Sequence, residues 1–189
     1  KPSFFGILVN PYFIVRYNIF KGIKKFSSDF NKGSLLDFGC GSKPYESLFK
    51  VEKYIGLDTN QSGHSHKNEK IDVLYDGKKI PFDDNHFDYI FSSEVLEHVF
   101  NIDEIISELN RVLKNDGKIL ITLPFVWGEH EQPYDYARYT SFGLKNILEN
   151  NGFEIIDHIK TTNFIETIFQ SLTSYLYHSI IPKGLKTFL

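Results

Sequence analysis

The sequence predicts an α/β fold with a mainly parallel, doubly wound sheet flanked by helices. Two observations support this prediction. Short apolar runs that end in polar or glycine residues alternate with amphipathic segments through the middle of the chain. A glycine-containing turn, LLDFGCGSKPY over residues 35–45, directly follows the first apolar run. Because alternating strands and helices build a parallel sheet covered on both faces, we expect a Rossmann-like arrangement.

The pattern also locates the individual elements. Segments with a strand pattern are 34–38, 54–57, 71–75, 87–91, 118–123 and 153–159. The clearest helix covers 101–114, where apolar residues recur at i, i+3, i+4 and i+7. Asn101 is expected to cap this helix, and Asn-Asp-Gly at 115–117 is expected to end it in a turn. Further helices are expected over 141–150, capped by Thr140, and from Asn10-Pro11 onward.

Composition limits the class of protein. The 189 residues suit one domain, with a core at about 30–160 and with helical segments 1–29 and 162–189 as caps. One cysteine excludes an internal disulfide and a cysteine-rich zinc site, and it favours a reducing, cytoplasmic location. A net charge of -3 argues against a broad nucleic-acid footprint, so no nucleic-acid partner is expected. No uninterrupted apolar run approaches the ~20 residues of a spanning helix.

The glycine turn indicates the kind of ligand. Gly39 and Gly41 allow a ligand to approach the backbone closely, and Asp58 ends the next strand at the spacing expected for gripping ribose hydroxyls. Pro44 stands where a dinucleotide fold has its third glycine, and proline lacks the N–H that would cradle a pyrophosphate. Asp37, which we expect in the same turn, suits a cationic ligand. For Gly39, Gly41 and Asp58, the alternative to a ligand site is a plain tight turn and an aspartate that merely lies on the surface.

Five motifs then carry a resemblance to a known family. They are LLDFGCGSKPY (35–45), YIGLDTN (54–60), IPFDDNHFDYIFSSEVLEHV (80–99), ELNRVLKNDGKILITLPF (108–125) and ENNGFEII (149–156). Together they resemble class I S-adenosylmethionine-dependent methyltransferases, above all the methyltransferase type 11 group, over roughly 34–159. The resemblance implies the class I methyltransferase fold, S-adenosylmethionine as cofactor, S-adenosylhomocysteine as product, and methylation of an oxygen or nitrogen.

The resemblance also assigns residues to the cofactor. It places Asp37, Gly39 and Gly41 along the methionyl part, Asp58 on the ribose, Asp76 and Gly77 near the adenine amino group, Leu57 and Ile80 beside the adenine ring, and Ser92, Ser93 and Glu94 near the methionine tail and methyl group. For Asp76 the alternative is an aspartate that only forms the Asp-Gly turn.

The segment EVLEH (94–98) raises the question of a metal. On a helix, Glu94, Glu97 and His98 would share one face, and two carboxylates with an imidazole suit a divalent cation. The segment is similar to a Glu-x-x-Glu-His pattern in metal-using methyltransferases of the small-RNA 3′-end and ubiquinone-pathway types. In the RNA type a further histidine completes the site, and His130 could serve in that role here. The favoured expectation is no metal, with His98 packing or hydrogen-bonding locally.

The segment 124–140, PFVWGEHEQPYDYARYT, follows the fifth strand and is expected to overhang the crevice. His130 is the predicted catalytic base, since histidine titrates near working pH. The predicted substrate contacts are Trp127 and Tyr134, which offer flat faces to a ring, and Arg138, which suits a phosphate or carboxylate. The alternative is a structural loop in which Arg138 pairs with Asp135.

The acceptor is expected to be a small molecule. The H-x-x-P-x-D-x-x-R-x-T arrangement resembles that of bacterial enzymes beside surface-polysaccharide genes, which hints at a sugar-linked acceptor. Two rival classes are an NAD(P)-dependent oxidoreductase, disfavoured by Pro44 and Asp37, and a non-catalytic cofactor-binding module. Both chain ends are aromatic and apolar, which favours core or homodimer packing over contact with a membrane surface.

Overall fold

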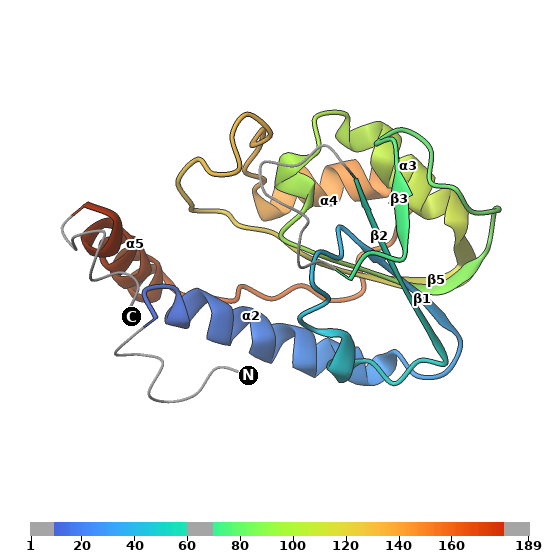
Figure 1. Cartoon of the computed structure of the whole chain (residues 1–189), viewed down its shortest axis with the longest axis horizontal. Helices are drawn as coiled ribbons and strands as arrows, with labels where there is room; N and C mark the ends of the chain where they lie inside the picture. Colours follow the sequence, from blue (N-terminus) through green and yellow to red (C-terminus); the bar gives the residue numbers. More distant parts are fainter. Residues whose placement is uncertain (1–9, 60–69, 180–189) are drawn as a thin grey trace. The chain divides into compact units, whose positions relative to one another are not determined.

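The computed structural model describes residues 10–59 and 70–179, and its centre is a five-stranded parallel sheet (Figure 1). The strands are β1 (Ser34–Phe38), β2 (Lys53–Thr59), β3 (Val73–Tyr75), β4 (Phe87–Ser93) and β5 (Leu113–Thr122). They lie in the order β3-β2-β1-β4-β5, and every neighbouring pair is parallel. The order reverses between β1 and β4, which confirms the predicted doubly wound fold and locates its ligand-binding edge.

Helices precede, connect and follow these strands in the sequence. The α-helices are α2 (Phe13–Phe26), α3 (Ile102–Val112), α4 (Ser141–Asn150) and α5 (Phe164–Ser179), and the 3-10 turns are η1 (Ser27–Asp29), η2 (Glu46–Leu48) and η4 (Leu96–His98). The chain divides into two compact units, 26–157 and the combination of 1–25 with 158–189. The first holds the sheet with α3 and α4. The single domain with terminal caps stays a prediction, and residues 1–9 and 180–189 of those caps lie outside the described part.

One face of the sheet packs against α3 and α4, which lie together on that side (Figure 1). Side chains alternate between faces along a strand, so Leu36 of β1 joins this core while the equally buried Leu35 points to the other face. The apolar stripe predicted for α3 is confirmed, because its buried residues are Ile105, Ile106, Leu109 and Val112.

The opposite face of the sheet carries aromatic side chains of the same unit. The rings of Phe49 and Phe91 lie 4.9 Å apart, and those of Phe30 and Tyr89 lie 4.8 Å apart. Phe30, Phe49 and Phe91 are all buried. Aromatic rings bury large apolar areas and pack in tilted pairs. This cluster therefore stabilises β1 and β4, the two strands between which the strand order reverses.

Two polar residues of α3 fix the connection between β3 and β4. Glu108 accepts the N–H of Ile80 at 2.9 Å, and Arg111 donates to the carbonyls of Ile80 and Phe82 at 2.9 and 2.8 Å. Arg111 also pairs with Glu108 at 2.7 Å. Polar groups in a half-buried loop need such partners, which gives the ELNRV segment a structural role.

The ends of α3 differ from the prediction. Asn101 makes no capping bond to the backbone, and its amide instead donates to Glu104 at 2.6 Å. The Asn-Asp-Gly sequence at 115–117 does not end the helix in a separate turn, because β5 begins at Leu113. These residues lie in an irregularity of β5, between the pairing of Phe87 with Leu113 and that of Tyr89 with Lys118.

The predicted sixth strand over 153–159 is wrong, since these residues belong to no strand. Phe153 and Ile155 pack against the core while Ile156 is 80% exposed. The alternating pattern therefore reflects one-sided packing of an extended segment without ladder hydrogen bonds. By contrast, α4 has its predicted bounds, and the Thr140 hydroxyl accepts the N–H of Gly143 at 3.0 Å as the predicted cap.

The second unit contains α2 and α5. The side chain of Asn10 accepts the N–H of Tyr12 at 2.9 Å just before α2, which confirms the predicted start of this helix. The predicted C-terminal helix is confirmed for Phe164–Ser179. Within the described ranges, no helix is long and apolar enough to cross a membrane.

Candidate active site

The turn after β1 holds the carboxylate that was predicted to bind ribose. Gly39 and Gly41 have φ angles of 74° and 45°, a region that favours glycine. Asp58 accepts the N–H of Gly41 at 2.9 Å and that of Thr59 at 2.8 Å, so its two oxygens are fixed beside the turn. A carboxylate oxygen accepts more than one hydrogen bond. The pair can therefore also receive two ribose hydroxyls.

Asp37 lies inside β1, not in the turn where the sequence placed it. Its side chain is buried, and the hydroxyl of Tyr54 donates to it at 2.6 Å. Burial raises the pKa of Asp37 to about 7, against the opposing effects of Tyr54 and nearby Lys43. Burial thus disfavours the charged form of Asp37, which weakens the argument that it attracts a cation directly.

Lys43 explains the atypical Lys-Pro ending of the motif. Its ammonium group pairs with Asp72 and lies 5.7 Å from the centre of the Tyr54 ring. Asp72 in turn accepts the N–H of Gly56 at 2.7 Å. A Cβ on Gly56 would lie 2.4 Å from Cε of Lys43, so the lysine stem crosses β2 where only glycine leaves room. Lys43 fastens the turn to the neighbouring strands, a role that the sequence reasoning missed.

The turns after β1 and β4 touch each other. A Cβ on Gly39 would lie 2.4 Å from Cγ2 of Val95, which follows β4. The strands on either side of the switch point therefore end in one continuous surface, as the predicted crevice requires. The close contact, the left-handed glycines and the fixed carboxylate of Asp58 fit a nucleoside with a cationic tail.

The residues that leave β4 form a hydrogen-bonded chain with β5. Thr122 donates to the carboxylate of Glu94 at 2.8 Å and lies 2.8 Å from the hydroxyl of Ser93. Glu94 has a φ of 57°, which is uncommon for a residue with a side chain and often marks a functional site. Burial raises its pKa. Ser92 is buried, and its hydroxyl has no hydrogen-bond partner among the described residues.

The structure gives less support to the residues that were predicted to contact adenine. Asp76 is exposed and accepts the N–H groups of Lys78 and Lys79 at 3.0 and 3.3 Å, which lowers its pKa. This is the local turn that the sequence left open as an alternative, so adenine contact stays a prediction. Leu57 and Ile80 are fully buried in the core, and neither presents a surface to a ring.

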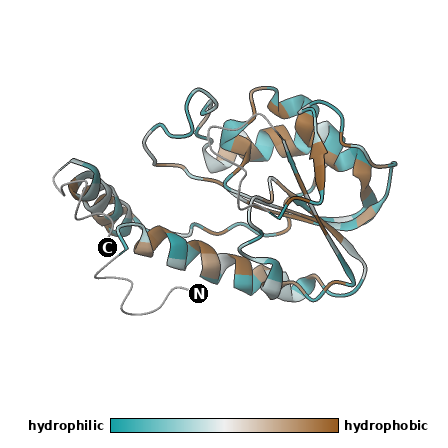
Figure 2. Cartoon of the chain, in the orientation of Figure 1, coloured by the Kyte–Doolittle hydropathy of each residue, from teal (hydrophilic) through white to brown (hydrophobic). Residues whose placement is uncertain are grey.

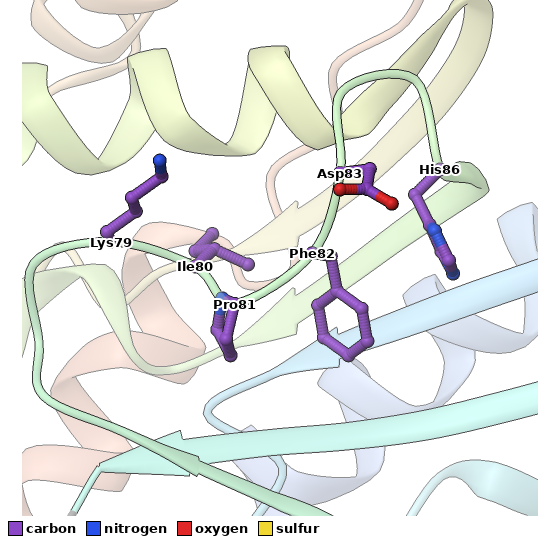
Figure 3. A pocket seen from close by; sticks show the side chains of 6 residues that line it. All are labelled: Lys79, Ile80, Pro81, Phe82, Asp83 and His86. Atoms are coloured by element: carbon purple, nitrogen blue, oxygen red, sulfur yellow. The ribbon is translucent and has the colours of Figure 1, made fainter.

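An open hollow of about 330 Å³ lies at the start of β4 (Figure 3). Its lining residues are Lys79, Ile80, Pro81, Phe82, Asp83 and His86. They precede β4 in the sequence, at the amino end of that strand. Ligands of this fold bind at the carboxyl ends, and of the residues predicted to contact the cofactor only Ile80 lines this hollow.

The segment 124–140 is tied to the turn η4. The carbonyl of Glu97 accepts the N–H groups of Tyr136 and Ala137 at 2.9 and 3.2 Å. The carbonyl of Tyr134 lies 2.8 Å from Nδ1 of His98. Because a carbonyl only accepts, Nδ1 of His98 carries a proton. Nε2 lies 3.7 Å from a carboxyl oxygen of Glu97 and 3.9 Å from one of Glu131. The predicted overhang thus joins the loop that follows β4.

His130 is oriented by an ionised carboxylate. Asp135 accepts the backbone N–H of His130 at 2.9 Å and lies 3.2 Å from its Nδ1, whose hydrogen bond goes to the carbonyl of Gly128 at 3.3 Å. Arg138 donates to both oxygens of Asp135, at 2.6 and 2.8 Å, and holds the pKa of that carboxyl well below its usual range. This is the Arg138–Asp135 pair that the sequence left open. A substrate contact by Arg138 stays a prediction, and it would need the guanidinium to leave Asp135.

Glu97 is a buried carboxyl with unused oxygens. It is 1% exposed, and neither oxygen has a hydrogen-bond partner among the described residues. Burial, with a contribution from Glu94, raises its pKa to about 8. Ligand atoms of Glu97, His98 and His130 lie within 4.8 Å of one another, so they form a cluster able to hold a metal ion.

The predicted helical face of Glu94, Glu97 and His98 is wrong. Only Leu96–His98 forms a 3-10 turn, and Glu94 lies before it in a left-handed conformation. The carboxylate of Glu94 is bound by Thr122, outside the cluster. Predicted substrate residues Trp127 and Tyr134 are half-buried in the overhanging segment, where nearby Phe125 is 63% exposed.

The doubly wound parallel sheet, with a glycine turn and the carboxylate of Asp58 beside its switch point, has the architecture of a class I methyltransferase. The chain belongs to a methyltransferase-domain family, whose model matches residues 14–158. The predicted family resemblance and S-adenosylmethionine as cofactor are confirmed.

Individual relatives agree with this assignment. The chain is 29% identical over 169 residues to phosphoethanolamine N-methyltransferase 2 of Caenorhabditis elegans, covering 81% of this chain and 37% of the relative. It is 33% identical over 120 residues to the ubiquinone biosynthesis O-methyltransferase of Pelagibacter ubique, covering 57% and 49%. The chain therefore spans less than half the length of these two curated relatives.

A solved structure supports the fold. Phosphoethanolamine N-methyltransferase 2 of Haemonchus contortus, solved in complex with S-adenosyl-L-methionine, superposes with a TM-score of 0.58 at 20% identity. The match covers 96% of this chain and 53% of that one. At this identity the likeness concerns the fold alone.

Proposed function

We propose that the protein transfers a methyl group from S-adenosylmethionine to an oxygen or nitrogen of a small-molecule acceptor, with His130 as the catalytic base. Bound S-adenosylmethionine supplies an electrophilic methyl group on a sulfonium. Asp58 would hold its ribose, and the Gly39–Gly41 turn with Ser92, Ser93 and Glu94 would line its methionine part. The chain's contribution is to align acceptor and cofactor and to take one proton from the acceptor.

The observation that carries this proposal is the Asp135–His130 pair. Asp135 lies 3.2 Å from Nδ1 of His130 and stays ionised beside Arg138. The carbonyl of Gly128, which only accepts, lies 3.3 Å from Nδ1 and places the proton there, which leaves the other nitrogen to accept a proton. The nearby carboxylate stabilises the ring once it has taken up that proton. The pair belongs to the segment that hydrogen-bonds to Glu97, next to the turn that follows β4.

The acceptor side offers apolar and aromatic surface. Phe125 and Val126 are 63% and 51% exposed, and Trp127 is half-buried beside them in the sequence. Flat faces suit a ring-containing acceptor, including the sugar-linked one that the sequence pattern favoured. The relatives' names add phosphoethanolamine and ubiquinone precursors as small molecules to screen.

The test is a comparison of His130→Gln and Asp135→Asn with the wild type in methyl transfer to the best acceptor of such a screen. His130→Gln should lower kcat by about 10²- to 10⁴-fold while the affinity for S-adenosylhomocysteine stays unchanged. Asp135→Asn should lower kcat in the same direction. His86→Gln, in the hollow at the start of β4, is the matched control. An active His130→Gln variant would refute the base.

The metal-capable cluster supports a second candidate role for His130. Glu97, His98 and His130 would hold a divalent cation that orients the acceptor, and His130 could then not accept a proton. The expected result for the favoured role is full activity in EDTA and no added activity with Mg²⁺, Mn²⁺ or Zn²⁺. Loss of activity in EDTA, restored by one of these ions, would assign His130 to the metal instead.

A further inference from the structure

Helix α5 presents its polar side chains to its own unit. Gln170 is buried, its amide nitrogen donates to the carbonyl of Pro11 at 2.7 Å, and its oxygen accepts the N–H of Val15 at 3.2 Å. The hydroxyl of Thr173 also donates to Pro11, at 3.1 Å. The polar side of α5 is therefore used to hold the start of α2.

The apolar side of α5, which we call its outer face, is exposed. Its members are Phe164, Ile165, Ile168, Phe169, Leu172, Tyr175 and Leu176, with exposed fractions between 38% and 77%. They recur at intervals of one, three and four residues, which aligns them along one side of a helix. Brown, hydrophobic residues recur along α5 in Figure 2. A helix that turns its apolar stripe outward needs a partner, because contiguous exposed apolar surface marks an interaction site.

Charge is distributed very unevenly between the two units. Residues 1–25 and 158–189 contain eight Lys or Arg residues and one Glu, a formal charge of +7. Residues 26–157 contain 13 Lys or Arg against 23 Asp or Glu, a formal charge of −10. Arg16, Lys21, Lys24 and Lys25 are all exposed on α2. The overall charge of −3 hides a strongly basic unit.

We propose that the unit formed by α2 and α5 docks onto a lipid surface with anionic headgroups, with the outer face of α5 entering the headgroup region. α5 supplies the apolar face, and the exposed basic residues of α2 in the same unit supply the positive charge, the two features that together hold interfacial helices at a membrane surface. Basic residues are attracted to anionic lipid. A second copy of the chain would bring two units of like charge together, which opposes association through this face.

Vesicle co-sedimentation of the full chain tests the proposal without cofactor or acceptor, so its outcome is independent of the proposed activity. The vesicles are phosphatidylcholine alone and phosphatidylcholine mixed with phosphatidylserine. The wild type should bind the mixed vesicles more strongly, and salt should weaken the binding. Ile168→Ser/Leu172→Ser should weaken it about tenfold or more, since two exposed apolar side chains lose their burial in lipid.

Charge is tested separately with Arg16→Gln/Lys21→Gln, which should weaken binding to mixed vesicles by about fivefold for each charge. Matched controls in the acidic unit are Lys145→Gln with Lys78→Gln for charge, and Phe142→Ser with Ile156→Ser for exposed apolar residues. Both controls should bind as the wild type does. Absence of vesicle binding overturns the proposal, as does equal binding by the Ile168→Ser/Leu172→Ser variant. A wild-type dimer in sedimentation velocity that this variant dissolves, without vesicle binding, would assign the face to a second copy and also overturn it.

Discussion

At the scale of single residues, the cofactor turn depends on an acid and a base that are both buried. Asp37 and Lys43 both contact Tyr54. The hydroxyl of Tyr54 donates to the carboxylate of Asp37, and the ammonium group of Lys43 lies over the Tyr54 ring. Burial disfavours the charged form of Asp37 more strongly than Tyr54 and Lys43 favour it, so the pKa of Asp37 rises to about 7. The residue that was read from sequence as a plain negative charge is therefore a group that titrates near neutral pH.

This raised pKa predicts a pH-dependent stability. The unfolded chain releases the proton of Asp37 near its ordinary pKa of 3.8, whereas the folded chain keeps it until about 7. The folded state binds the proton more tightly, so the free energy of unfolding falls as pH rises between these two values. The fall amounts to about 1.4 kcal/mol for each pH unit that separates the folded pKa from the unfolded pKa. Asp37→Asn should lose this fall in urea unfolding measured from pH 4 to pH 8.

The exposed Asp116→Asn substitution serves as the control and should keep the wild-type pH profile. Parallel unfolding curves for the wild type and Asp37→Asn across that range would show that Asp37 does not titrate as its burial implies.

At the scale of elements, the ligand edge depends on close contact between the turns after β1 and β4. Gly39→Ala would place a Cβ 2.4 Å from Val95 in a backbone with φ of 74°, and it should lower the free energy of unfolding by about 1–3 kcal/mol. Gly128→Ala is the matched control, because nothing lies within 4 Å of its added Cβ. Denaturant unfolding measures both.

The double variant Gly39→Ala/Val95→Ala separates the two causes. Removing the valine methyl groups should recover the part of the loss that comes from overlap and leave the part that comes from the backbone conformation. If Gly39→Ala is as stable as Gly128→Ala, the contact between the two turns does not constrain this edge.

Elements were predictable where their signals are local. Apolar periodicity gave α3 and the first strands, and Thr140 with Gly143 gave the start of α4. The false sixth strand came from the same signal, because one-sided packing and strand pairing both produce alternation. Periodicity cannot tell them apart without a partner strand.

Within the site, the sequence predicted Gly39, Gly41 and Asp58 correctly as one group, because a βα turn and the next strand end have a fixed spacing. The pair of Lys43 with Asp72 was missed because the partners are 29 residues apart and Asp72 lies outside the motif that contains Lys43. The contact between His130 and Asp135 was missed because residues 124–140 form an irregular loop, which has no hydrophobic periodicity from which side-chain contacts can be predicted.

At the scale of the whole molecule, the chain combines an acidic unit that carries the proposed cofactor-binding edge of the sheet with a basic unit that carries an exposed apolar helix face. The strand order and the turn at the switch point concern the first unit, and the family match over residues 14–158 covers all of it together with part of α2. The central claim is that this edge binds S-adenosylmethionine through Asp58, the carboxylate held by the N–H groups of Gly41 and Thr59.

Isothermal titration calorimetry with S-adenosylhomocysteine tests this claim most directly. The wild type and Asp116→Ala, the exposed control, should bind it with equal affinity. Asp58→Ala should lose at least about tenfold in affinity, since each hydrogen bond from a hydroxyl to a charged group contributes about 1.5–3 kcal/mol. NADH should not bind to any of the three. Normal affinity in Asp58→Ala, or binding of NADH in place of the thioether by the wild type, would contradict the account.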